Sequence, residues 1–530
     1  MANKTLFKSK RGRHVPAADT INEAGGLAYG MPPKHLLAQY AATGCLNATF
    51  YASADEQLAA VLKICESVPP HFIARTAVYA RQKGYMKDLP ALLCAVLASK
   101  SPGLLAAGVF DRVIDDGRML RNFVQILRSG ATGRKSLGSL PKRLVRGFFE
   151  RRDDAAVFRA SVGNDPSIAD VIKMVHPRPA TKSREALYGY LIGRPHDDAA
   201  LPEIVRQFEA FKRASAAAAA DDTGEMPDVP FQMLTSIPLS TRNWQSIAQQ
   251  APWQMTRMNL NTFARHGVFE DEALTKLIAD RLRSPELIAK AKVFPYQLMV
   301  AYTQADQAVP ESVRDALQDA MEIAIGNVPA VDGKVYVFPD ISGSMHSPVT
   351  GFRPGATSVV RCVDVAALVA AAMLRKSRQA EVIPFETKVV NVPLNPRDSV
   401  MTNAKALSSL PAGGTNCSAP LKELNRRKAT GDLLVYVSDN ESWVDSPWYG
   451  RFGGGRTATM NEWQTFKARN PLAKLVCIDI QPYGSTQATE RDDILNIGGF
   501  SDRVFNVIAE FANGTLAADH WAGVIEKVEI

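Results

Sequence analysis

The sequence predicts a multidomain protein in which an all-α series of helical repeats precedes an α/β domain with a doubly wound parallel sheet. Three observations carry this prediction. Residues from about 20 to 325 show apolar positions at helical spacing almost throughout, without convincing strand alternation. From about residue 328, short runs of β-branched residues alternate with helical patterns. The chain has 530 residues, which is more than one hydrophobic core ordinarily supports.

The first part of the chain is typical of many short helices in series. The segments Leu89–Ile114 and Glu272–Gln304 carry apolar residues three and four positions apart, interrupted by proline and glycine. Short helices that bury their apolar faces only against their neighbours are typical of an α-solenoid of HEAT type. The alanine-rich segment Arg213–Pro230 is either a surface connector or an extension of the preceding helix, and the sequence favours neither.

The second part contains four runs that we expect to be buried strands. They are short and apolar, as in parallel sheets that are covered on both faces. Because the runs alternate with helical segments such as Arg361–Ser377, they indicate βαβ units, in which ligands bind beyond the carboxyl ends of the strands. The four runs are KVYVFPD (334–340), AEVIPFE (380–386), DLLVYVSD (432–439) and KLVCIDI (474–480).

Oxygen-bearing side chains follow these strands. Asp340, Ser342 and Ser344 alternate along the turn after the first strand, Thr415 stands behind a glycine pair, and Asp439 ends a later strand. The turn has neither the glycine spacing of a dinucleotide site or P-loop nor the GxSxG motif of a serine hydrolase. A phosphotransferase that uses Asp340 as its nucleophile would have a second acid two residues later, where this chain has Ser342. Two carboxylates and three hydroxyls suit a divalent cation, with Mg²⁺ the expected ion, that accepts an acidic oxygen from a partner. The alternative is that Asp340 caps the following helix.

The excess positive charge lies entirely in the first part. From Val331 onward 21 basic and 21 acidic residues cancel, so the net charge of +8 comes from the residues before it. The segment Arg118–Arg152 holds ten basic residues and one acid, Glu150, which favours contact with a polyanion over a solvated face of mixed sign. The Pro-rich loop Val175–Glu185 adds His176, Arg178, Lys182 and Arg184. Because no RRM, KH or zinc-finger signature is present, the expected targets are RNA shape and single-stranded ends.

Other functional classes are disfavoured by features that the sequence lacks. The six scattered cysteines include no CxxC pair, which fits reduced thiols in the cytosol. No HExxH pair is present, which argues against a zinc hydrolase. No apolar run approaches the ~20 residues of a membrane span, and the first residues lack the apolar core of a signal peptide. We therefore expect a cytoplasmic protein with no membrane partner.

Three motifs together resemble the metal-ion-dependent adhesion site of von Willebrand factor A domains. In chain order they are the DxSxS turn, the GGT sequence and the aspartate that ends a later strand. A basic all-helical module followed by such a domain is similar to the Ro autoantigen family, whose N-terminal part is the TROVE module. The similarity covers nearly the whole chain and extends to bacterial members. It is carried by RKSLGSLPKRLVRGFF, VHPRPATKSREALYGYLI, KVFPYQLMVAYT, PAGGTNCSAPL and VSDNESW.

The resemblance implies a basic arm at residues 1–19, a TROVE module at 20–327 and an A domain at 328–530. It implies that the helical repeats form a ring closed by the A domain, that Y RNA binds the basic outer surface, and that single-stranded 3′ ends of misfolded or decaying RNA enter the central hole. Bacterial members are further implied to tether a 3′-to-5′ exoribonuclease through Y RNA, in RNA quality control and stress survival. We expect a non-enzymatic scaffold that is monomeric when free.

The expected RNA contacts combine this resemblance with local charge. Lys142, Arg143 and His176 match basic positions of the family, although the family's segment before Lys142 is more aromatic than the Leu137–Ser139 segment of this chain. The residues added for the charge around them are Arg134, Lys135, Arg146 and Arg178. The alternative function is a protein-binding adaptor that uses the A domain, with the helical repeats docking polypeptide.

Overall fold

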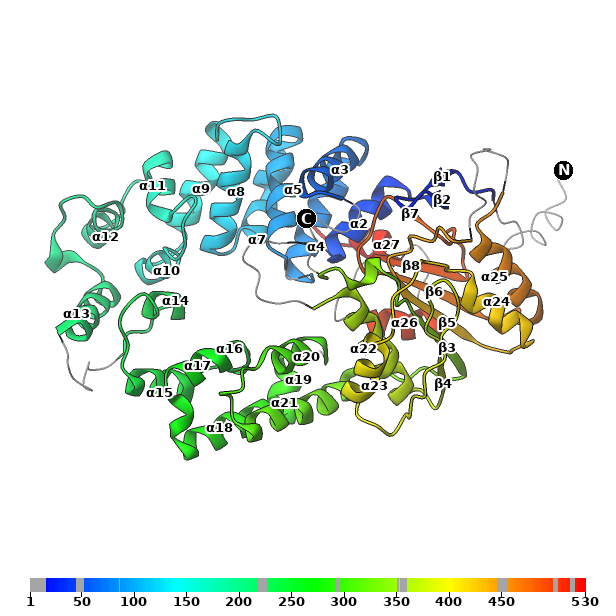
Figure 1. Cartoon of the computed structure of the whole chain (residues 1–530). Coiled ribbons are helices and arrows are strands. Elements are labelled where there is room, and N and C mark those ends of the chain that lie inside the picture. Colours follow the sequence, from blue (N-terminus) through cyan, green and yellow to red (C-terminus); the bar gives the residue numbers. More distant parts are fainter. Residues whose placement is uncertain are drawn as a thin grey trace. The chain divides into compact units, whose positions relative to one another are not determined.

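The computed structural model describes residues 16–43, 52–84, 86–217, 226–291, 293, 295–349, 352, 360–445, 455–498, 504–514 and 520–530. These residues form two compact units (Figure 1). The helical unit contains the described parts of 65–279, 306–313 and 525–530, and the sheet unit contains those of 1–64, 280–305 and 314–524. Within the described residues, no helix is long and apolar enough to cross a membrane.

The helical unit consists of short helices that pack on their neighbours, which confirms the predicted all-helical repeats. Helix α4 packs on α5, α5 packs on α8, and α11 packs on α8, α9 and α12. The helices with more than three residues are α4 (Pro70–Gln82), α5 (Asp88–Lys100), η1 (Leu105–Val109), α7 (Phe110–Val113), α8 (Gly117–Ser129), α9 (Ser139–Glu150), α10 (Asp154–Arg159), α11 (Ile168–Val175), α12 (Lys182–Ile192), α13 (Glu203–Ala217), α14 (Phe231–Leu234), α15 (Thr241–Gln250), α16 (Trp253–Met258), α17 (Leu260–Arg265) and most of α18 (Glu272–Leu282).

Helix α8 illustrates how the sequence sets these elements. The Asp116 carboxylate caps its N-terminus by accepting the main-chain N–H of the third helical residue at 2.7 Å. The helix ends at Gly130, whose φ of 88° lies in the left-handed region that glycine adopts readily. Apolar residues three and four apart, such as Phe123, are buried, so that Arg118 and Arg128 remain exposed.

The sheet unit is built on five parallel strands in the order β4–β3–β5–β6–β8, which confirms the predicted parallel sheet. The four runs predicted as strands all contribute, and β8 is an addition to them. The strands are β3 (Lys334–Pro339), β4 (Gln379–Val382), β5 (Leu433–Ser438), β6 (Lys474–Asp479) and β8 (Ile494–Gly498). The helices of the unit are α2 (Pro33–Thr43), α3 (Ala54–Ser67, which continues into the helical unit), α19 (Pro285–Ala291), α20 (Pro295–Gln304), α21 (Glu311–Ala324), α22 (Cys362–Lys376), α23 (Val400–Ser408), α24 (Ala419–Arg426), α25 (Ala458–Arg469), α26 (Val504–Ala512) and α27 (His520–Glu526).

Helices cover both faces of this sheet because alternate strand residues point to opposite faces. One set, represented by Phe338 and Tyr436, packs with Trp463 and Phe466 of α25 and with apolar residues of α24. Helix α22 contacts β3, β4 and β5 without entering that cluster, and α23 packs on α22. The domain is therefore doubly wound, as the alternation of strands and helices predicted.

A short antiparallel sheet lies where the sequence predicted helices. Strands β1 (Thr20–Ile21) and β2 (Leu27–Gly30) form a hairpin, and β2 also pairs with β7 (Ser485–Thr486). The hairpin therefore belongs to the sheet unit, and the division between the two units does not follow the expected boundaries at 19/20 and 327/328. The physical reason is that β2 completes its backbone hydrogen bonds with a strand more than 450 positions away.

The structure decides in part whether the alanine-rich segment is a surface connector or an extension of the preceding helix. Helix α13 continues through the first alanines to Ala217, so this part extends the preceding helix. Residues 218–225 lie outside the described residues, as do residues 1–15 of the expected basic arm.

Candidate functional site

The carboxyl ends of three neighbouring strands place oxygen side chains in one row. Register pairs Pro339 of β3 with Val437 of β5, and Ser438 of β5 with Asp479 of β6. Asp340, which follows β3, is therefore level with Ser438, whose hydroxyl donates to its Oδ2 at 2.5 Å. Asp439 comes directly after Ser438. The strand pattern thus predicted the position of both aspartates correctly.

Hydrogen bonds lock the turn after β3 into one conformation. The Ser342 N–H donates to Asp340 Oδ1 at 2.8 Å, and the Ser342 and Ser344 hydroxyl oxygens lie 3.4 Å apart. Among the described residues that follow, Ser344–His346 form a single 3₁₀ turn, η5, whose N-cap is Gly343, and α22 begins at Cys362 with Arg361 as its N-cap. The alternative in which Asp340 caps that helix is therefore wrong.

Main-chain hydrogen bonds attach the Thr415 loop to both aspartate loops. The Gly343 N–H donates to the Gly413 carbonyl at 3.0 Å, and the Trp443 N–H donates to the Thr415 carbonyl at 3.1 Å. All five residues predicted as cation ligands are buried, with exposed fractions of 0–5%. The structure thus brings Asp340, Ser342, Ser344, Thr415 and Asp439 together in three loops of the sheet unit that are joined by hydrogen bonds.

The two aspartates repel each other electrostatically. Burial, followed by the negative charge of Asp439, raises the pKa of Asp340 to about 7, against hydrogen bonds from Ser438 and Ser342. Burial likewise raises the pKa of Asp439, against hydrogen bonds from the Ser344 hydroxyl and the Glu441 N–H. A divalent cation between such oxygens would offset both the desolvation and the repulsion. The donor set, which contains only oxygens and two carboxylates, fits Mg²⁺.

Two buried acids behind this cluster escaped the sequence prediction. Glu441 and Asp479 are 0% and 3% exposed, and Glu441 Oε1 and Asp479 Oδ1 have no hydrogen-bond partner among the described residues. Burial and the charge of Asp439 raise the pKa of Glu441 to about 9, and the same two causes raise that of Asp479. Asp479 ends a strand next to β5, so the rule that found Asp439 applied to it too. Across the described ranges no three His, Cys, Asp or Glu side chains form a metal site by themselves, so hydroxyls must complete it.

A second group of predicted residues gathers on the helical unit. Lys142, Arg143 and Arg146 lie within four positions of one another on α9 and are exposed. Arg146 Nε donates to the Val175 carbonyl at the end of α11 at 2.5 Å, which places it beside exposed His176. None of these four basic residues forms an ion pair with a described residue. We call Lys142, Arg143, Arg146 and His176 the α9–α11 basic face.

The remaining predicted RNA contacts have other surroundings. Arg134 is half-buried because its Nη1 donates to the Ala98 carbonyl at 2.7 Å, whereas Lys135 is exposed. Arg178 lines a cavity of about 760 Å³ together with the acids Glu150 and Asp153. Arg134 therefore joins α9 and its preceding loop to the end of α5, and Arg178 lies in a cavity that also contains acids, so neither is counted in the α9–α11 basic face.

The loop after α11 is shorter than the sequence suggested. Lys182 and Arg184 belong to α12, because Thr181 caps that helix by accepting the Arg184 N–H at 3.0 Å. Arg184 is 9% exposed and forms an ion pair with Asp154 at 2.5 Å. It also donates to the Phe149 carbonyl at 2.8 Å, so it joins α12 to the end of α9.

Comparisons with known proteins agree with this fold. Residues 334–512 match the family model of the Ro60 von Willebrand factor A domain. The C-terminal domain is therefore similar to the Ro60 A domain. The whole chain is 24% identical to the RNA-binding protein RO60 of Deinococcus radiodurans, over 93% of this chain and 95% of that protein. The crystal structure of the Ro (Rsr) protein of the same organism matches 92% of this chain and all of that chain, with a TM-score of 0.62 and 21% identity.

These findings confirm the resemblance to the Ro autoantigen family that the motifs carried. The family model covers the three loops of the cation cluster, and the structural match extends the Ro fold to the helical repeats.

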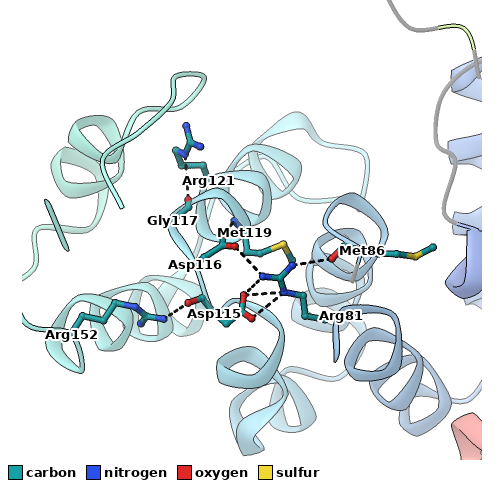
Figure 2. Close-up of polar contacts among 8 residues, drawn as sticks. All are labelled: Arg81, Met86, Asp115, Asp116, Gly117, Met119, Arg121 and Arg152. Atoms are coloured by element: carbon teal, nitrogen blue, oxygen red, sulfur yellow. Dashed lines mark hydrogen bonds and ion pairs between the residues drawn. The ribbon is translucent and has the colours of Figure 1, made fainter. Parts of the chain in front are cut away.

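Several arginines of the basic segment are used inside the Ro-type helical unit rather than offered to a ligand. Arg121 donates to the Gly117 carbonyl at 3.3 Å, and Arg152 donates to the Asp115 carbonyl at 2.8 Å. Both contacts are drawn in Figure 2. The Arg152 guanidinium also lies 3.4 Å from the Phe148 ring centroid. The sequence suggested that the ten basic residues between 118 and 152 form one uniform surface. The structure shows instead that some of them bind other parts of the protein.

Arg81 of α4 anchors the start of α8. It donates to Asp115 at 2.5–3.1 Å, to Asp116 at 3.0 Å and to the Met86 carbonyl at 3.2 Å (Figure 2). Because Asp116 is also the N-cap of α8, one guanidinium connects α4 to the helix that precedes the basic face.

We expect Arg81→Ala to lower the free energy of unfolding of the helical unit by roughly 2 kcal/mol. Water can solvate the two half-exposed carboxylates that remain, which keeps the cost below that of a fully buried pair. Urea unfolding followed by circular dichroism would measure it. Arg118→Ala is the matched control, because this exposed arginine, two positions after Asp116, makes no side-chain hydrogen bond with described residues; it should change the free energy by no more than about 0.5 kcal/mol.

Proposed function

We propose that the protein is a non-enzymatic RNA-binding scaffold of the Ro type, which binds structured RNA on the α9–α11 basic face. One observation carries the proposal: Lys142, Arg143, Arg146 and His176 converge on one exposed surface without acidic partners among the described residues. Arginine and lysine at such a surface contact phosphates, and a loop histidine beside them can stack on a base or contact a phosphate. The RNA-binding name of the Deinococcus relative supports the same reading.

The RNA partners follow from the family as part of the proposal. Y RNA would occupy the basic face, and single-stranded ends of misfolded or decaying noncoding RNA would enter the central hole of the ring that the family resemblance implies. A 3′-to-5′ exoribonuclease tethered through Y RNA would connect the protein to RNA quality control and stress survival. We propose that the protein is cytoplasmic and is a monomer when free of RNA.

The A domain would contribute a cation site of low charge. Asp340, Ser342, Ser344, Thr415 and Asp439 would hold a divalent ion, which we propose to be Mg²⁺, directly or through water. The bound ion would accept an acidic oxygen from a partner, since two carboxylates leave a divalent ion electrophilic. The chain's own part is to hold these oxygens in place through the hydrogen bonds between the three loops.

Copurification and salt dependence test the RNA proposal. The purified protein should carry RNA, seen as absorbance near 260 nm that nuclease removes. Three phosphate contacts from Lys142, Arg143 and Arg146 predict a slope of about −2.7 in a plot of log affinity against log salt, which is roughly a 40-fold loss between about 50 and 200 mM. Binding of a labelled RNA hairpin that lacks this slope would contradict the proposal and favour the protein-docking adaptor.

A further inference from the structure

The A domain concentrates its positive charge where the chain enters the parallel strands. Three segments lead into β4, β5 and β6, namely residues 375–379, 425–432 and 467–474, and together they hold nine basic residues and one acid. The loops at the opposite, carboxyl ends hold four acids and no lysine or arginine; they are residues 340–347, 411–418 and 439–445. The balance of acids and bases after residue 331 therefore conceals two oppositely charged edges. We call the three basic segments the amino edge.

The sheet and its side-chain hydrogen bonds bring the three segments together. The register aligns the starts of four strands in one row, which is Ala380 of β4, Val335 of β3, Leu433 of β5 and Lys474 of β6. Arg427 Nη1 donates to Glu381 Oε1 of β4 at 2.6 Å. Arg469 Nη2, at the end of α25, donates to Asn425 Oδ1 at 2.6 Å. Because neighbouring strands lie about 4.8 Å apart, the amino edge is one continuous surface.

The acids of the domain do not neutralise all of these bases. Five of the nine are occupied by other groups: Arg375 by Glu322, Arg426 and Arg427 by Glu423, Lys467 by Asp493, and Lys474 by the Ala512 carbonyl. Glu381 is itself held by Lys334 and Arg427 at 3.1 and 2.6 Å. The other four bases form no ion pair in the part of the chain that the structure describes; they are Lys376, Arg378, Lys428 and Arg469.

Helix ends explain two of these four bases and leave two unexplained. Lys376 and Arg469 are the last residues of α22 and α25, where a cation interacts favourably with the helix dipole. Arg378 and Lys428 lie beyond the ends of α22 and α24, are exposed, and make no side-chain hydrogen bond with described residues. Their charges therefore face solvent without a structural role in the fold.

The backbone of Lys428 is in a conformation that lysine rarely adopts. Its φ of 53° lies in the left-handed region, and its N–H donates to the Asn425 carbonyl at 3.1 Å at the end of α24. Glycine or asparagine ordinarily occupies this position after a helix, because a longer side chain is strained there. A strained residue whose side chain makes no contact that would repay the strain points to a function.

The composition of the amino edge favours phosphate over an acidic protein. The core of a protein interface needs aromatic or large apolar anchors. The three segments contain no aromatic residue, and Leu472 is their one large apolar side chain. Contacts to a phosphate backbone need only cations, and a guanidinium matches the geometry of a phosphate group.

We propose that the amino edge of the A domain is a second RNA-binding surface, which contacts the phosphate backbone through Arg378, Lys428 and their basic neighbours. The inference rests on the proposed RNA-binding function and adds a surface to it that is separate from the α9–α11 basic face. Because the amino edge has no aromatic side chain on which a base could stack, the contact is independent of RNA sequence and weakens with salt.

Binding that remains after the α9–α11 basic face is disrupted tests this surface. The background is the full chain with Lys142→Glu and Arg143→Glu, and fluorescence anisotropy measures its affinity for a labelled RNA hairpin from about 50 mM salt upward. Adding Arg378→Glu and Lys428→Glu should weaken the remaining binding by about tenfold at the lowest salt. The slope of log affinity against log salt should become shallower by about 2.

Two further variants separate a phosphate contact from net charge and from folding. Lys388 and Lys405 are exposed lysines of the same unit, outside the amino edge, that form no ion pair with described residues. Changing both to glutamate in the same background should alter the affinity by less than about threefold. Lys428→Gly removes the cation together with the backbone strain, so it should raise Tm while weakening RNA binding by about threefold. An unchanged affinity in this variant would contradict the role of Lys428.

The outcomes distinguish this inference from the proposed function. If the amino-edge pair costs no more than the control pair, the second surface is wrong, and the α9–α11 basic face is judged by its own substitutions in the wild type. If those substitutions cost nothing and the amino-edge pair does, the second surface stands and the α9–α11 proposal fails. If acetyl-(Glu)10 amide binds more tightly than a ten-nucleotide oligouridine and only the amino-edge pair abolishes this, the surface takes acidic polypeptide instead. If no form binds RNA at about 50 mM salt, both proposals fail.

Discussion

Replacing both Lys142 and Arg143 with glutamate is expected to weaken binding of a structured RNA by about 100-fold, or about 2.7 kcal/mol. Two phosphate contacts are lost, and two negative charges then face the RNA. The slope of log affinity against log salt should become shallower by about 2. Both side chains are exposed on α9 and make no hydrogen bond with described residues, so the substitutions should leave the fold intact. Fluorescence anisotropy with a labelled hairpin over a salt series measures both quantities.

The matched control is a double variant that changes the net charge by the same amount at exposed residues outside the α9–α11 basic face. Lys276 on α18 and Lys405 on α23 are exposed lysines that form no ion pair with described residues. The double variant Lys276→Glu, Lys405→Glu should bind RNA within about threefold of the wild type, since charges that make no phosphate contact are largely screened at physiological salt. Equal losses in the two double variants would show that net charge alone drives binding. Full binding by the α9 variant would place the RNA elsewhere.

Local sequence patterns predicted the elements that depend on neighbouring residues. Short β-branched runs gave β3, β4, β5 and β6, and the position of an acid directly after a strand located Asp340 and Asp439. The rule works because the carboxyl ends of parallel strands meet at one edge. Thr415 was found by the glycine pair before it, and Gly414 does have a close neighbour in Trp443.

The sequence could not predict the features that depend on contacts between residues far apart in the chain. The β1–β2 hairpin is too short for a recognisable strand pattern, and it exists because β7 completes it. Arg184 belongs to a basic run, yet its guanidinium is buried against Asp154 and the Phe149 carbonyl. Charge density along a sequence therefore overestimated the phosphate-binding surface, because arginines that bridge helices look the same as arginines that bind a ligand.

Asp340→Asn is expected to abolish the response of the A domain to Mg²⁺. In the wild type, Mg²⁺ at about 100 times its Kd should add about 2.7 kcal/mol to the free energy of unfolding, which for a domain of this size raises Tm by roughly 5–10 °C. The variant loses one of two carboxylates and should show no shift, while its RNA binding stays at the wild-type level because the α9–α11 basic face is unchanged. Asp479→Asn, which removes a buried carboxylate from the neighbouring strand end, is the matched control and should keep the Mg²⁺ response.

The pH dependence gives the same site a second signature. Without metal, the folded-state pKa of Asp340, about 7, is above its unfolded value, so its neutral form contributes stability that is fully present below about pH 4 and is lost as the pH rises through 7. Between pH 5 and pH 8 this contribution of Asp340 should be on the order of 3 kcal/mol. It is absent in Asp340→Asn, which keeps the pH dependence that comes from the raised pKa values of Asp439, Glu441 and Asp479. Mg²⁺ needs the ionised carboxylate, so its stabilisation should shrink below pH 6 and reach its full size near pH 8. Differential scanning calorimetry from pH 5 to pH 8, with EDTA or Mg²⁺, measures both trends. A Mg²⁺ response that does not change with pH, or that survives in the variant, would mean that Asp340 is not a ligand.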